Sequence, residues 1–179
     1  MIKKSDIAFF VLFLTLIANA CVYAMDNEIT RQTLRGMQSL YVAVEEIQPN
    51  VVKYGKKIGL TSEQIKKDVE IKLKTAGIKA LSKNEWLITP GRPMLYLNIN
   101  FHEYEKYWYA YDIKLEISQI VFLERNLLIK TMANTWSINM TGVANVGTLN
   151  SVRNNAGKVV DRLIEAYNAA NRNSPVAGN

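Results

Sequence analysis

Reactive side chains are scarce in this chain of 179 residues, which contains one cysteine and one histidine. A lone histidine cannot build a histidine-rich zinc site, and the sequence has no His-Glu-x-x-His pattern. Cys21, as the only thiol, allows neither an internal disulfide nor a thiolate cluster. We therefore expect a domain that is stabilised by a hydrophobic core and that uses no metal and no cofactor.

Catalytic and phosphate-binding motifs are also missing. The segment 142–147 has two glycines, but it lacks both the G-x-G-x-x-G spacing and a lysine followed by serine or threonine. Neighbouring carboxylates on a strand, such as Glu45 and Glu46, point to opposite faces and cannot share a site. Glu103 and Glu105 lie where a hairpin is expected, in contact with water. The chain is therefore predicted to be non-enzymatic.

The longest apolar run is short and lies at the N-terminus. A basic head with Lys3 and Lys4 precedes an apolar stretch at 7–18, the pattern of a secretory signal peptide. A membrane span needs about 20 apolar residues. Cleavage before Met25 is expected, so residues 1–24 form the signal, and an uncleaved anchor or lipid attachment at Cys21 are the alternatives. The sequence predicts a periplasmic or secreted protein.

The charge excess is mild. The formal net charge is +6, and removal of Lys3, Lys4 and Asp6 with the signal leaves +5 on 155 residues. Basic and acidic residues are interleaved, as at 66–70. This pattern is typical of a solvent-exposed helix face and not of a basic surface that binds the phosphate backbone of a nucleic acid. We expect no nucleic-acid partner, whereas association with an anionic membrane surface stays open.

Hydrophobic periodicity predicts one α+β domain at 37–171, after a flexible leader or short helical turn at 25–36 and before a disordered tail at 172–179. The long strands alternate apolar and polar residues, so one sheet face is buried. We expect a two-layer domain, with two main helices packed on one face of a mostly antiparallel sheet. The expected strands are 39–47, 78–81, 94–102, 108–123 and 127–140, and the expected helices are 61–77 and 149–170.

Aromatic residues cluster around the expected hairpin between the strands 94–102 and 108–123. Tyr104, Tyr107 and Trp108 lie at the turn, and Tyr96 and His102 lie on the preceding strand. Tyrosine and tryptophan offer a large contact area with a polar group, so these five residues form a candidate partner-binding patch. The alternative is ordinary stabilisation of the sheet, because aromatic residues favour strands and pair across them.

Four short segments carry a resemblance to known proteins. The segments Leu34–Gly36 and Leu40–Glu45, followed by Lys67–Glu70 and Leu73–Ile78, resemble a group of small secreted bacterial proteins of uncharacterised function. The strand, helix and Leu-x-x-Ala-Gly-Ile unit is also similar to the amino-terminal domain of the TolB translocation protein and to the curli secretion lipoprotein CsgG. The resemblance implies a non-enzymatic, partner-binding domain of the periplasm. The chain lacks the propeller that follows the TolB domain and a good lipobox.

Three functions are open at this point. The first is a periplasmic binding or envelope-assembly module with an envelope protein as its partner. The second is a carrier of a small apolar or anionic ligand between sheet and helices. Its pocket would be lined by Leu97, Ile99, Leu115 and Leu163. The third is an enzyme in which His102, Glu103 and Asp112 converge in a concave site.

Overall fold

The structure is a computed structural model that describes residues 26–172. The expected signal peptide at 1–24 and residues 173–179 of the expected tail lie outside the described residues. The described chain has the predicted α+β class, with a five-stranded mixed sheet and five α-helices. None of the helices in 26–172 combines the length and the apolar character needed to cross a bilayer.

The strands are β1 (Ser39–Val44), β2 (Lys79–Leu81), β3 (Met94–Glu105), β4 (Trp108–Leu123) and β5 (Asn126–Asn145). The α-helices are α2 (Glu28–Gln32), α3 (Pro49–Gly55), α4 (Ser62–Thr75), α5 (Lys83–Ile88) and α6 (Asn150–Asn171). Two short 3-10 helices, η1 (Lys56–Ile58) and η2 (Val146–Thr148), follow α3 and β5. The strand order is β2-β1-β3-β4-β5. β1 is parallel to both neighbours, whereas β3, β4 and β5 form an antiparallel meander.

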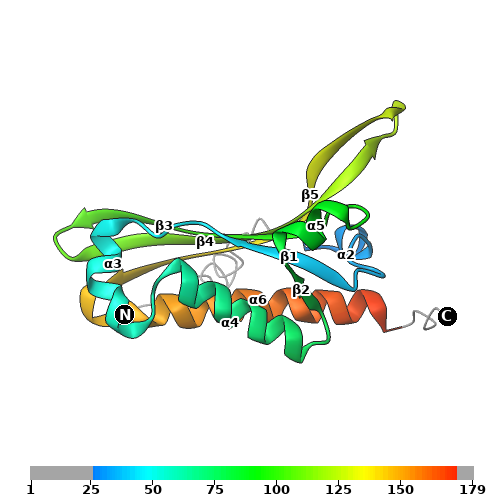
Figure 1. Cartoon of the computed structure of the whole chain (residues 1–179). Coiled ribbons are helices and arrows are strands. Elements are labelled where there is room, and N and C mark those ends of the chain that lie inside the picture. The colour runs from blue at the N-terminus through cyan, green and yellow to red at the C-terminus, as the bar shows by residue number, and fades with distance from the viewer. Residues whose placement is uncertain (1–25, 173–179) are drawn as a thin grey trace, which may run out of the picture.

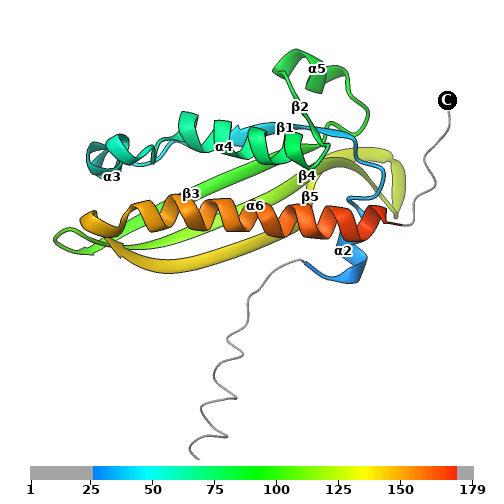
Figure 2. The ribbon, with the colours of Figure 1, turned by 90° about the horizontal axis from the view of Figure 1, so that it is seen from below.

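The alternation of β4 decides which face of the sheet is buried. Its odd-numbered residues from Tyr109 to Ile117 are buried, and the even-numbered residues between them are more exposed. α4 and α6 lie side by side beneath this face (Figure 1), and both run along the sheet when seen from below (Figure 2). Each helix contributes an apolar stripe to one core. The stripes include Ile65, Val69 and Leu73 from α4 and Val152, Val159 and Leu163 from α6.

The start and the end of α4 follow the sequence closely. The Thr61 hydroxyl accepts a hydrogen bond from the Gln64 N–H at 3.3 Å, which caps the first turn. Gly77 follows the helix with a φ of 79°, the left-handed conformation that glycine adopts without steric cost. The expected helix over 61–77 is thus confirmed to within two residues at its end.

The region after β1 differs from the prediction. β1 ends at Val44 and not at 47, and Pro49 starts α3 where a connection was expected. Proline suits the first turn of a helix, because its φ is already helical and that position needs no N–H. Proline after a strand was interpreted only as the end of that strand, so α3 was missed.

The segment 25–36, predicted to be a flexible leader or helical turn, contains α2. Asn27 caps this helix, and its Oδ1 accepts from the Thr30 N–H at 3.0 Å. Asp26, next to the cap, accepts a hydrogen bond from Trp136 Nε1 of β5 at 3.0 Å. The leader is therefore held against the sheet.

β4 and β5 extend beyond the rest of the sheet. The last pair between β3 and β4 is Met94 with Ser118. At the same place the pairing between β4 and β5 skips one residue of β5. Residues 119–133 continue as a two-stranded ribbon, here named the arm, which projects away from the sheet (Figure 1). The arm and the β3–β4 turn lie at opposite ends of β4.

Candidate functional site

An exposed group of aromatic side chains surrounds the turn between β3 and β4. The exposed fractions are 53% for Tyr104, 47% for Tyr107 and 40% for Trp108. The structure brings these three predicted residues together at one end of the sheet, where α3 also lies (Figure 1). With Tyr54 of α3, they are named the aromatic end.

Sequence reasoning missed Tyr54. Its ring centroid lies 6.0 Å from that of Tyr107, and the ring planes meet at 88°, an edge-to-face contact. The two residues are 53 positions apart, and the contact depends on α3, which was not predicted. The available signal was Pro49, because a helix starting there places Tyr54 in its second turn.

Lysines surround these rings. Lys53 Nζ lies 4.7 Å from the Tyr54 ring centroid, and Lys106 Nζ lies 5.2 Å from that of Tyr107. Both distances are within the range of cation–π attraction. A shallow hollow of about 470 Å³ opens beside the rings. It is lined by Tyr54, Lys106, Tyr107, Trp108, Asn145, Val146 and Gly147.

Tyr107 is held in an unfavourable backbone conformation. Its φ is 69°, in the left-handed region, where a residue with a side chain costs about 1–2 kcal/mol. Tight hairpins usually place glycine or asparagine at such a position. The Tyr107 N–H donates to Glu103 Oε1 at 3.1 Å, and this bond helps to fix the turn. A side chain at a strained, exposed turn is a feature typical of functional sites.

The other two predicted residues lie outside this group. The Tyr96 hydroxyl donates to the Glu45 carboxylate in the middle of the sheet, and this hydrogen bond together with burial raises the pKa of Tyr96. His102 is exposed, two residues before Tyr104, on the sheet face opposite the helices. The predicted patch of five residues is thus divided, with three at the aromatic end and two along β3.

Two of the three residues proposed for catalysis are neighbours on one face of the sheet. His102 lies opposite Ala110 and Asp112 lies opposite Asn100, so His102 and Asp112 are diagonal neighbours across β3 and β4. Burial raises the pKa of Asp112, but the hollow beside the aromatic end includes neither Asp112 nor His102. Within residues 26–172 there is no group of three or more side chains suited to a metal ion.

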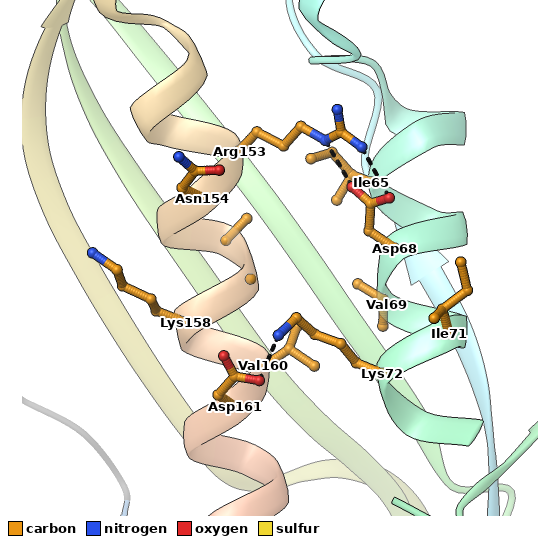
Figure 3. Close-up of a pocket in the computed structure, with 12 residues that line it drawn as sticks. Ile65, Asp68, Val69, Ile71, Lys72, Arg153, Asn154, Lys158, Val160 and Asp161 are labelled. Atoms are coloured by element: carbon orange, nitrogen blue, oxygen red, sulfur yellow. Dashed lines mark hydrogen bonds and ion pairs between the residues drawn. The ribbon is translucent and has the colours of Figure 1, made fainter. Parts of the chain in front are cut away.

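The four side chains expected to line a ligand pocket belong to the core. Leu97, Ile99, Leu115 and Leu163 are all 2% exposed or less and pack in one hydrophobic cluster. A hollow of about 420 Å³ lies instead on the outer side of the helices, between α4 and α6 (Figure 3).

Two ion pairs cross this groove between the helices. Arg153 Nε and Nη2 donate to Asp68 at 2.7 and 3.0 Å, and Lys72 Nζ lies 2.6 Å from Asp161 Oδ1 (Figure 3). Burial alone would raise the pKa of Asp68, but the hydrogen bonds and positive charge of Arg153 prevail and lower it. In each pair the positive and negative side chains neutralise each other. The two ion pairs therefore join α4 and α6 across the groove.

Comparison with known proteins assigns no family, because no protein-family model and no curated protein matches the chain. The resemblance to envelope modules therefore stays a prediction. The aromatic end is the candidate site because of its geometry: exposed rings, neighbouring lysines and a strained turn.

Proposed function

We propose that this protein is a non-enzymatic binding module of the bacterial cell envelope. In this proposal a signal peptide exports the chain, and a two-layer domain presents the aromatic end to an envelope protein. The observation that carries the proposal is Tyr107, which occupies a left-handed turn position where glycine would be more stable. The contact with Tyr54 offsets this cost, and the ring stays 47% exposed and available to a partner.

The chemistry of the aromatic end indicates the kind of segment that it binds. Tyr54, Tyr107 and Trp108 offer ring faces and edges to apolar or planar groups, which is how aromatic residues act at interfaces. Lys53 and Lys106 next to the rings supply positive charge. We therefore propose a partner segment that combines apolar side chains with Asp or Glu.

Replacement of Tyr107 by glycine tests the proposal directly. Tyr107→Gly relieves the strain but loses the contact with Tyr54, so the free energy of unfolding should stay within about 1 kcal/mol of the wild type. Binding of the partner should weaken by about tenfold or more, since aromatic residues are frequent binding hot spots. The partner would first be identified by cross-linking in intact envelopes, and its Kd then measured by titration with each variant.

The matched control is Phe122→Ala, which removes an exposed ring from the opposite end of β4. We expect it to leave the Kd for the free partner in solution unchanged. Equal Kd values for the wild type and Tyr107→Gly would remove the aromatic end as the binding site. Loss of binding only in Phe122→Ala would assign binding to the arm.

A further inference from the structure

The arm exposes apolar side chains that no other part of the described chain covers. Beyond Ser118 it has two strands and no third, and an isolated two-stranded hairpin is at best marginally stable in water. Leu128 is 93% exposed and Phe122 is 60% exposed. Ile120 lies directly opposite Met132, so these two side chains share one face of the ribbon.

α5 adds an exposed apolar side chain near the base of the arm. The Ile120 N–H donates to the Gly91 carbonyl at 2.7 Å, which joins the base of the arm to the segment that follows α5. Ile88, the last residue of α5, is 84% exposed. We name the combined region the arm surface. It comprises Ile88, Phe122, Leu127, Leu128, Ile129 and Met132.

A lipid bilayer does not suit the arm surface. The turn at its tip is formed by Glu124 and Arg125, both exposed. Insertion of the arm would carry these two charges deepest into the hydrocarbon, where each costs several kcal/mol. The charged tip therefore favours a protein partner that leaves the end of the arm in water.

A second copy of this chain fits the charges and the area. Two positively charged copies can approach through their arms, because the only charged residues of segment 119–133 are Glu124, Arg125 and Lys130. The six side chains of the arm surface expose on the order of 600 Å², from about 150–200 Å² for a fully exposed large side chain. A stable interface buries about 800 Å² on each partner, so the backbone and the polar side chains of the arm must bury the remainder.

We propose that the arm surfaces of two copies pack against each other around a twofold axis and make the protein a homodimer. In such a dimer the same patch is used by both subunits, so Leu128 and Phe122 of one arm are covered by the arm of the other copy. The two aromatic ends then lie at the far ends of the dimer, since each occupies the opposite end of β4 from the arm.

Leu128→Lys tests the homodimer. The side chain is almost fully exposed, so the fold and the circular dichroism spectrum of each subunit should be unchanged. Sedimentation equilibrium on the protein as processed by its host should give a dimer for the wild type. The variant should dissociate with a Kd raised about tenfold or more, the effect of removing one interface hot spot. Ile71→Lys is the matched control, because Ile71 is 63% exposed on α4, away from the arm.

Three outcomes would overturn the homodimer. The first is a wild-type monomer at about 100 μM, a concentration that saturates micromolar dimers. The second is a dimer that Ile71→Lys disrupts and Leu128→Lys does not. The third is a monomer that binds anionic phosphatidylglycerol vesicles through Leu128, which would assign the arm to the membrane.

Discussion

At the scale of single residues, Asp26 joins three distant parts of the chain. Its carboxylate accepts from Arg31 Nε at 2.5 Å and from Trp136 Nε1 at 3.0 Å, and Arg162 Nη2 lies 3.7 Å away. The side chain is only 3% exposed, and Trp136 is fully buried. The hydrogen bond from Arg31 lowers the pKa of Asp26. Burial alone would raise this pKa, but the hydrogen bond from Trp136 lowers it further, and the net shift is downward.

Asp26→Asn should therefore destabilise the fold in a pH-dependent way. At pH 7 we expect the free energy of unfolding to fall by about 2 kcal/mol, since a charged hydrogen bond contributes roughly 1.5–3 kcal/mol. The pKa of Asp26 is lower when folded, so its contribution is complete above the unfolded value of 3.8 and is lost as the pH falls through the folded pKa. Urea unfolding of wild type and variant should give curves that converge in acid.

The control for Asp26 is Glu70→Gln. Glu70 Oε1 lies 4.0 Å from Lys66 Nζ, and both side chains are 39% exposed. Such a surface pair contributes less than about 1 kcal/mol, so the control should track the wild type at every pH. A gap between wild type and Asp26→Asn that stays constant from neutral pH to acid would contradict an ionic role for Asp26.

At the scale of the elements, β5 continues through Gly142, beyond the expected end of this strand at residue 140. Gly142 lies inside β5, directly opposite Tyr111 of β4. The Tyr111 ring lies over the glycine, where a Cβ would collide with the phenol, and Asn155 Nδ2 donates to the Tyr111 hydroxyl at 2.8 Å. A glycine can thus be part of a strand when an aromatic side chain occupies its missing volume.

Gly142→Ala should displace the Tyr111 ring and strain the joint between β4, β5 and α6. We expect a loss of about 1–3 kcal/mol in the free energy of unfolding, the usual cost of overpacking. Thr141→Ala, at the exposed neighbouring position, should change stability by less than about 0.5 kcal/mol. Thermal unfolding of both variants measures the difference, and a Gly142→Ala protein as stable as Thr141→Ala would show that the ring moves without cost.

Burial on one face explains which elements the sequence predicts well. β4 was predicted with its observed bounds, because its residues from Tyr109 to Ile117 alternate between core and exterior. The arm has the same strand-forming residues, yet no other part of residues 26–172 covers it. Local periodicity reports the conformation of a segment but not what lies against it, so neither the exposed Leu128 nor the contact of Tyr54 with Tyr107 could be predicted.

At the scale of the whole molecule, the two proposed surfaces lie at opposite ends of β4. A dimer joined through its arms would carry two aromatic ends, and a partner displayed on an envelope surface could be held at both. Binding at the second site would then be intramolecular, which typically raises apparent affinity by about 10²–10⁴-fold. The dimer would thus convert a modest single contact into stable attachment.

Leu128→Lys should separate the affinity of each site from the avidity of the dimer. Against a partner densely immobilised on a surface, apparent binding should weaken by about 10²-fold or more, because each monomer then holds one site only. Against the same partner free in solution, the Kd per site should be unchanged, since Leu128 belongs to the arm, at the opposite end of β4 from the turn that holds Tyr107. Tyr107→Gly should instead weaken both measurements. If Leu128→Lys weakened binding in solution as well, the arm itself would contact the partner. The assignment of dimerisation to the arm and of partner binding to the aromatic end alone would then be wrong.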